Sequence, residues 1–264
     1  LIWSLAILLP VAALVSITVG TVDISVSDAL SALTGNSVNT QTQTILFDIR
    51  LPRILLAIAV GAVLASTGAV MQGLFRNPLA DPSLIGVSSG ASVGASLMIV
   101  TAGGFIQSGA LLGLSLVAVG AFVGGFAATL LVYRLATSGI GTSVTTMLLA
   151  GIAIGALSGA LNSLLSYFSD NDMLRQISLW QMGNLSGASW TKVTIMGAVA
   201  LLLIGLFPRE SKALNALLLG ESEARHLGID VQRVKRRLIV LTALGVGVSV
   251  ASAGLVGFVG LIMP

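Results

Sequence analysis

The sequence predicts an all-α protein that crosses a membrane several times. Of its 264 residues, 55% are hydrophobic and only 9% are charged, and the mean hydropathy is +1.02. A soluble domain is about 25% charged, so this chain has too little polar surface to face water on all sides. Its apolar residues also form long uncharged runs between short polar segments, as transmembrane helices require.

Seven runs are long enough to be predicted as spans, and an eighth begins near the end of the sequence. The first contains Pro10, which predicts a kink, and a short helix is expected after it, with Ser27 as N-cap and Gly35 as its stop. The whole chain, 1–264, is interpreted as one transmembrane domain that is incomplete at both ends and truncated after the start of the eighth span. The predicted spans are 2–20, 54–75, 84–102, 110–133, 144–168, 193–207 and 238–253, followed by the partial span 255–263.

Charge is concentrated in one loop, 209–237, which separates the sixth span from the seventh. If this loop is cytoplasmic and the spans alternate, nine Lys and Arg residues lie inside and four lie outside, in agreement with the positive-inside rule. Two short helices are expected in the loop, 211–219 and 222–227, with Ser222 as cap of the second and Gly220 and Gly228 as their stops. Helices this short are marginal alone, so they must pack on something.

An internal repeat relates residues 50–78 to residues 236–264, with ten identities in 29 positions. The first copy contains the second predicted span and the second copy contains the seventh, so the two are an odd number of spans apart, five, and cross the membrane in opposite directions. Inverted repeats of this kind are typical of transporters. Glycines at four-residue spacing, Gly90 with Gly94 and Gly120 with Gly124, predict close helix packing.

Several kinds of chemistry lack the residues that they need. The sequence has no cysteine, one histidine (His226), no phosphate-binding G-x-x-x-x-G-K-[ST] motif and no hydrolase triad. An enzyme, a metal site and ATP binding by this chain are therefore not expected, and juxtamembrane basic residues indicate topology, not nucleic-acid binding. No charge lies within a predicted span, which disfavours an ion-coupled secondary transporter, the main alternative from another class. A membrane scaffold without transport is a third alternative.

Longer motifs connect the sequence to a known family. They are RLPR (50–53), GAVMQGLFRNPLADP (68–82), GVSSGA (86–91), LLAG (148–151), LLGESEARHLG (218–228) and GFVGLIMP (257–264). Over its whole length the chain resembles the FecCD-type permeases, the membrane subunits of ATP-binding-cassette (ABC) importers for iron chelates, haem and cobalamin. The sequence at 75–78, 147–152 and 220–228 most resembles that of the haem importers, and siderophore and cobalamin permeases remain alternatives.

The resemblance implies a ten-span type II importer permease in the bacterial inner membrane. It implies two copies of the permease, two cytoplasmic ATPases that carry ATP and Mg²⁺, and a periplasmic binding protein that delivers the substrate. This chain itself is expected to bind no cofactor. The energy for transport would then enter through the charged loop, 209–237.

The resemblance also implies roles for individual residues. Arg50 and Arg53 would face acidic residues of the binding protein, and the alternative is anchoring to lipid headgroups. The inner end of the fifth span would form a gate from Ser143, Thr145, Thr146 and Leu149, and the alternative is simple helix capping by Ser143 with backbone bonding by the threonines.

The loop would contact the ATPase, and the alternative is a solvated connector that packs only on its own bundle. The residues expected to form this coupling surface are Leu217, Leu219, Gly220, Glu221, Ala224, Leu227 and Gly228.

Overall fold

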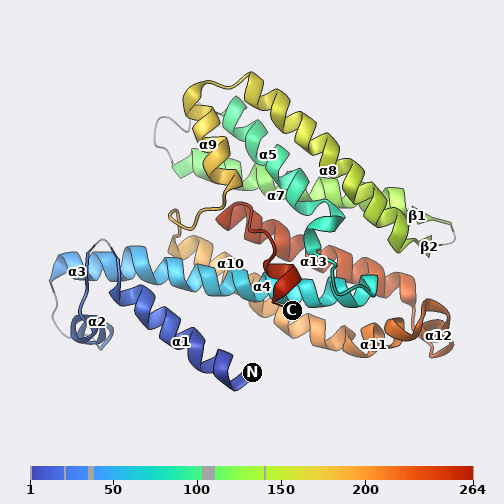
Figure 1. Cartoon of the computed structure of the whole chain (residues 1–264), viewed down its shortest axis with the longest axis horizontal. Coiled ribbons are helices and arrows are strands. Elements are labelled where there is room, and N and C mark those ends of the chain that lie inside the picture. Colours follow the sequence, from blue (N-terminus) through green and yellow to red (C-terminus); the bar gives the residue numbers. More distant parts are fainter. Residues whose placement is uncertain (1, 21, 35–38, 103–110, 140, 264) are drawn as a thin grey trace.

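The chain folds into a bundle of long helices with short helices at both ends (Figure 1). The computed structural model describes residues 2–20, 22–34, 39–102, 111–139 and 141–263. The elements are α1 (Ile2–Thr18), α2 (Val26–Leu33), α3 (Thr40–Thr44), the π-helix η1 (Ile45–Arg50), α4 (Leu51–Phe75), the 3₁₀-helix η2 (Pro82–Ile85), α5 (Val87–Thr101), α7 (Leu111–Ala136), β1 (Thr137–Ser138), β2 (Gly141–Thr142), α8 (Val144–Tyr167), α9 (Asn171–Gln181), α10 (Trp190–Leu206), the 3₁₀-helix η3 (Phe207–Glu210), α11 (Ser211–Leu219), α12 (Glu221–His226), α13 (Val231–Ala253) and α14 (Val259–Ile262).

The helices confirm the prediction of an all-α membrane protein. Five continuous stretches are long and apolar enough to cross a bilayer, and two shorter apolar helices accompany them. Each of the seven predicted spans overlaps one of these helices. The five long stretches are Thr40–Phe75, Leu116–Ala136, Val144–Tyr167, Trp190–Leu219 and Val231–Ala253, and the shorter ones are Trp3–Thr18 and Val87–Thr101.

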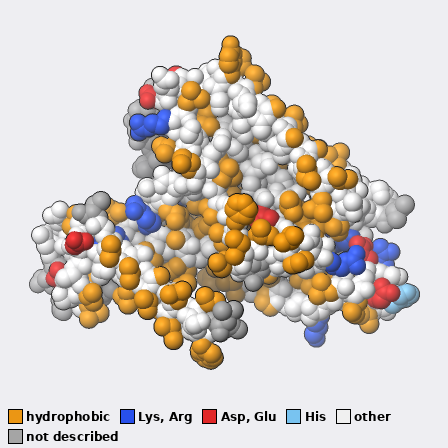
Figure 2. Space-filling model, viewed as in Figure 1, with side chains coloured by type: hydrophobic (Ala, Val, Ile, Leu, Met, Phe, Trp, Pro, Cys, Tyr) orange, Lys and Arg blue, Asp and Glu red, His pale blue; other side chains and the backbone are white. Residues whose placement is uncertain are grey.

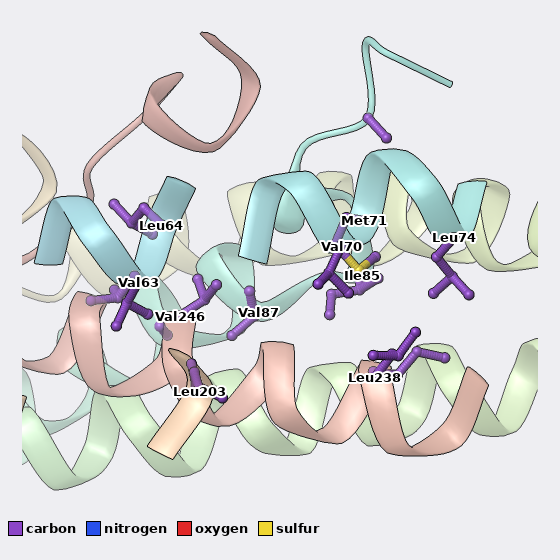
Figure 3. Packing of buried hydrophobic residues seen from close by; sticks show 14 of the residues in the cluster. Val63, Leu64, Val70, Met71, Leu74, Ile85, Val87, Leu203, Leu238 and Val246 are labelled. Carbon is purple, nitrogen blue, oxygen red and sulfur yellow. The ribbon is translucent and has the colours of Figure 1, made fainter. Parts of the chain in front are cut away.

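Helix α4 packs against α13 (Figure 3). Near one end of the contact Leu74 lies beside Leu238, and near the other Val63 lies beside Val246. The two helices therefore run antiparallel. Since α4 and α13 contain the two copies of the sequence repeat, this direction is the one that an inverted repeat requires.

The second copy of the repeat differs from the first at its end. Helix α4 continues without a break to Phe75, whereas α13 stops at Gly254, whose φ of 72° interrupts the helix. Residues 254–257 are not helical, and the short α14 then packs against α4, where Gln72 Nε2 donates to the Leu261 carbonyl at 3.1 Å. The predicted eighth span thus begins as a broken helix instead of a continuous one. Such breaks are tolerated in a membrane where protein or water satisfies the backbone.

Two predicted helix starts need correction. Ser25, not Ser27, caps α2, because its Oγ accepts a hydrogen bond from the Asp28 N–H at 3.1 Å; the predicted stop at Gly35 lies outside the described residues. Helix α13 begins at residue 231 instead of 238, because Asp230 caps it by accepting from the Arg233 N–H at 3.0 Å. Much of the basic cluster in the predicted loop therefore belongs to the first turns of a membrane helix.

Helices α5 and α7 approach each other so closely that their backbones touch. A Cβ atom at Gly94 would lie 2.0 Å from the Gly120 carbonyl oxygen, and one at Gly90 would lie 2.3 Å from the Gly124 oxygen. The four-residue glycine spacing in both helices therefore marks their contact face, as the sequence predicted.

Candidate functional site

Charged side chains gather at one end of the molecule (Figure 2). Helices α11 and α12 and the start of α13 lie there, and the β1–β2 hairpin lies at the same end (Figure 1). Gly220 joins α11 to α12 with φ of 136° and ψ of 155°, a backbone conformation that is essentially restricted to glycine. Helix α12 begins at Glu221, so Ser222 is not its cap; Gly220 occupies that position without a side-chain hydrogen bond.

The predicted coupling residues divide into an exposed set and a buried set. Leu219 and Leu227 are 70% and 65% exposed, and Glu221 is partly exposed between them in the chain. Leu217 and Ala224 are 3% and 0% exposed and belong to the main core. Their side chains therefore hold α11 and α12 on the bundle and are not part of an exposed surface.

Ion pairs fix this end of the bundle internally. Lys235 Nζ lies 2.6 Å from Glu221 Oε1, which joins α13 to α12, and the Arg237 guanidinium pairs with the Glu210 carboxylate, which joins α13 to η3. Lys235 is only 2% exposed, although the sequence placed it in the charged loop that was expected to be cytoplasmic. Its spacing from the apolar Val231 and Leu238 on one helical face was the signal that could have placed it inside.

The predicted gate residues lie at the same end of the molecule. Ser143 is the N-cap of α8, and its Oγ accepts hydrogen bonds from the Thr146 N–H at 3.3 Å and from Thr146 Oγ1 at 3.0 Å. Thr145, Thr146 and Leu149 are exposed, and Leu149 is 64% exposed. Capping by Ser143 is thus present, and the described part of the chain leaves one face of the first turns of α8 uncovered, whereas Met147 on the other face is buried.

The two predicted docking residues have different environments. Arg53 is exposed on the first turn of α4. Arg50 is 8% exposed, and its guanidinium donates to the Ile17 and Val22 carbonyls at the end of α1 and just beyond it. It thereby satisfies backbone acceptors that a helix C-terminus leaves without partners. Arg50 is therefore a structural clamp on α1 within this chain, and only Arg53 is free to face a partner.

An open pocket of about 480 Å³, which sequence reasoning missed, lies between η2, α5, α8 and the non-helical segment before α14, and polar side chains line part of it. Asn162 on α8 donates from Nδ2 to Ser92 Oγ on α5 at 3.0 Å, while its Oδ1 is buried without a hydrogen-bond partner among the described residues. Serines at helical spacing were the available signal. The polar side chains that line the pocket are Asp81, Ser83, Ser88, Ser89, Ser92, Ser158 and Asn162.

Among the described residues, no three His, Asp or Glu side chains lie close enough together to hold a metal ion. His226 ends α12 and is exposed at the charged end of the molecule (Figure 2).

Comparison with known proteins gives consistent matches along nearly the whole chain. The profile of the FecCD transport family matches residues 8–264. The hemin transport system permease protein HmuU of Yersinia pestis is 43% identical over 262 residues, which cover 98% of this chain and 75% of HmuU. The vitamin B12 import system permease protein BtuC of Salmonella typhimurium is 41% identical over 261 residues, 99% of this chain and 75% of BtuC.

A solved structure of a metal-chelate type ABC transporter in an inward-facing conformation has the same fold. It superposes with a TM-score of 0.83 at 33% sequence identity, covering 98% of this chain and 78% of that one.

Proposed function

Because this chain belongs to the FecCD transport family, we propose that it carries haem from a periplasmic binding protein into the cytoplasm. The chain is a multi-pass permease subunit of a bacterial inner-membrane ABC importer, and a separate ATPase subunit hydrolyses the ATP. The observation that supports haem is the 43% identity to a hemin permease along 98% of this chain. The 41% identity to a vitamin B12 permease makes cobalamin the second candidate.

Transport by the reconstituted importer tests the substrate. The full-length permease, its ATPase and its binding protein would be placed in liposomes, and ATP-dependent uptake of haem, cobalamin and a ferric siderophore would be measured in parallel. We expect uptake of haem alone. Uptake of cobalamin without haem would establish the second candidate, and no ATP-dependent uptake of any of the three would contradict both.

We propose that two copies of the permease face each other across the exposed side of α8, with the substrate path between them. Along this helix a row of large apolar side chains is left uncovered by the described part of the chain. These side chains begin at the proposed gate residue Leu149 and extend along α8. The row consists of Leu149, Ile152, Leu157, Leu161 and Leu164, whose exposures range from 40% to 64%.

Cysteine cross-linking tests this pairing in a cysteine-free background, which these 264 residues already provide. Two Leu149→Cys side chains near a two-fold axis should form a disulfide between copies in at least one nucleotide state, because a disulfide needs Cα atoms within about 7 Å. Leu201→Cys, which is 74% exposed on α10, is the matched control and should give no cross-linked dimer. Cross-linking through residue 201 but not through residue 149 would place the second copy elsewhere.

We propose that Arg53 contributes to docking of the binding protein. Reversing its charge, Arg53→Glu, should slow association roughly tenfold at low ionic strength, and the difference should shrink as salt screens the charges. Arg53→Lys keeps the charge and should associate at nearly the parental rate. Surface plasmon resonance with the binding protein measures both. Equal association rates for all three proteins would leave headgroup anchoring as the role of Arg53.

We propose that the exposed part of the loop, with Leu219, Gly220, Glu221, Leu227 and Gly228, contacts the ATPase. The exposed Leu219 and Leu227 supply apolar contact area, and the Glu221 carboxylate, whose side chain is 32% exposed, supplies a polar group beside them. The buried Leu217 and Ala224 support this surface from beneath.

A further inference from the structure

The ammonium group of Lys235 connects three elements at the charged end of the bundle. Lys235 belongs to the second turn of α13, and its Nζ donates to Glu221 Oε1 on α12 at 2.6 Å and to the Thr142 carbonyl on β2 at 2.7 Å. With 2% of its side chain exposed, it is shielded from solvent. Salt and water therefore weaken these contacts much less than they weaken a surface ion pair.

Thr142 is fixed to α13 from two directions. Its N–H donates to Gln232 Oε1 at 2.9 Å, and its carbonyl accepts from Lys235. The next residue, Ser143, is the N-cap of α8, and its own N–H donates to the Ala136 carbonyl at 2.9 Å. Thr142, the last residue of the hairpin, is thus held by α13, and α12 contacts the same helix. Thr142 directly precedes Ser143, the first of the proposed gate residues.

Other ion pairs at this end do not make this connection. Among the described residues, Arg225 pairs with Glu221 within α12, and Arg233 pairs with Asp230 at the start of α13. Arg237 connects α13 to η3 through Glu210. Of the ion pairs that the structure describes, only the one with Lys235 extends by a further hydrogen bond to the hairpin.

We propose that Lys235 is a positioning residue that transmits movement of α12 to the first turn of α8. This inference rests on the proposed contact between α12 and the ATPase. A shift of Glu221 would displace the short, charge-assisted hydrogen bond between its carboxylate and the buried ammonium group of Lys235. The same ammonium group also holds the carbonyl of Thr142, one residue before Ser143, so its displacement would pull on the start of α8. The path is contiguous and made of rigid elements joined by hydrogen bonds, the kind of network through which coupling between two sites is carried.

The test measures the response of the gate to nucleotide. A Thr145→Cys reporter, at an exposed position of α8, is placed in the full-length permease assembled with its ATPase in nanodiscs. The rate of maleimide labelling is compared without nucleotide and with a non-hydrolysable ATP analogue. In the parent we expect a nucleotide-dependent change in rate. Lys235→Met should reduce that change at least about fivefold, the lower range of measured coupling between sites.

A double-variant comparison separates a linkage from general loosening. Glu221→Gln cuts the same connection at its partly exposed end, so it should reduce the nucleotide response as Lys235→Met does. If both residues act in one series, the Glu221→Gln/Lys235→Met double variant should be no more impaired than Lys235→Met alone. If Lys235→Met does not assemble, Glu221→Gln carries the test together with the Leu219→Cys cross-link to the ATPase, because Glu221 also belongs to the proposed coupling surface. If the reductions of the nucleotide response in the two single variants add up in full in the double variant, the proposal is overturned.

Arg237→Gln is the matched control, because it removes a partly buried ion pair from the same helix end without touching the hairpin. It should retain the parental nucleotide response. A Leu219→Cys cross-link to the ATPase reports separately on the coupling surface. If that cross-link forms and the response in Lys235→Met equals the parental one, the linkage is wrong and the coupling surface stands. If no cross-link forms, the coupling surface is wrong and the linkage fails with it.

Discussion

Replacing Gly220 with tryptophan should abolish transport while the protein still inserts and folds. The backbone at Gly220 has φ of 136° and ψ of 155°, and a Cβ atom there would lie 2.5 Å from Glu223 Oε2. Any larger residue therefore bends the junction of α11 and α12, and an indole also adds bulk to the proposed ATPase contact. If the substitution removes about 3 kcal/mol of binding free energy from this contact, as at an interface hot spot, the affinity for the ATPase falls roughly 100-fold.

Two measurements on matched variants check this result. ATPase co-purification and ATP-dependent uptake are compared for Gly220→Trp and for Gly205→Trp, where the same bulk is added on α10 at an exposed position with no neighbouring atom within 4 Å. Gly205→Trp should transport at nearly the parental rate. Parental transport by Gly220→Trp would show that this junction does not contact the ATPase.

A single methyl group on the contact face of α5 should have the largest effect on stability. In Gly94→Ala the new Cβ would lie 2.0 Å from the Gly120 carbonyl oxygen, which is backbone and cannot rotate away. The two helices must therefore separate along their contact. Overpacking of this kind costs on the order of 3 kcal/mol, which is a large part of the stability of a typical domain.

The same substitution at open positions is the control. Gly61→Ala on α4 and Gly197→Ala on α10 add a methyl group where no atom lies within 4 Å, so they should be neutral or stabilising by up to about 1 kcal/mol through helix propensity. Thermal unfolding in detergent, followed by size-exclusion chromatography, compares the three proteins. If Gly94→Ala unfolds at the same temperature as the controls, the close approach of α5 and α7 is not required for the fold.

The positions of the membrane helices could be predicted because the length of an apolar run determines whether that run can cross a membrane. The starts and interruptions of helices were less predictable, because they depend on single side chains. Asp230 begins α13 seven residues before its apolar run, and Gly254 ends it although the corresponding Gly68 lies within an unbroken helix. Glycine permits a positive φ without requiring it, and the surrounding structure decides which occurs.

Charged residues were the weakest part of the sequence interpretation. Arg50 was predicted to face a binding protein or lipid headgroups, and Lys235 was placed in the charged loop, but both are buried. Each is buried because it has specific oxygen partners: the Ile17 and Val22 carbonyls for Arg50, and the Thr142 carbonyl with Glu221 for Lys235. Such partners come from distant segments of the chain, so composition and topology rules cannot identify them. Motif position did not identify exposure either, because Leu219 and Leu227 are exposed whereas Leu217 and Ala224 of the same predicted surface are buried.

The continuous helix Thr40–Phe75 has a consequence for how a carrier protein reaches the membrane. Its 36 residues span roughly 54 Å at about 1.5 Å per residue, and a tilt of about 20° shortens this only to roughly 51 Å. A bilayer with its headgroups is about 40–45 Å thick. Helix length alone therefore leaves roughly 6–11 Å beyond the headgroups, and the polar first turn of this helix, α3 (Thr40–Thr44), would be the part that stands outside the lipid as a rigid post. A binding protein that docks from this side would contact that post before it contacts any lipid headgroup. The length of the helix would then set the distance from the lipid at which the binding protein releases its substrate.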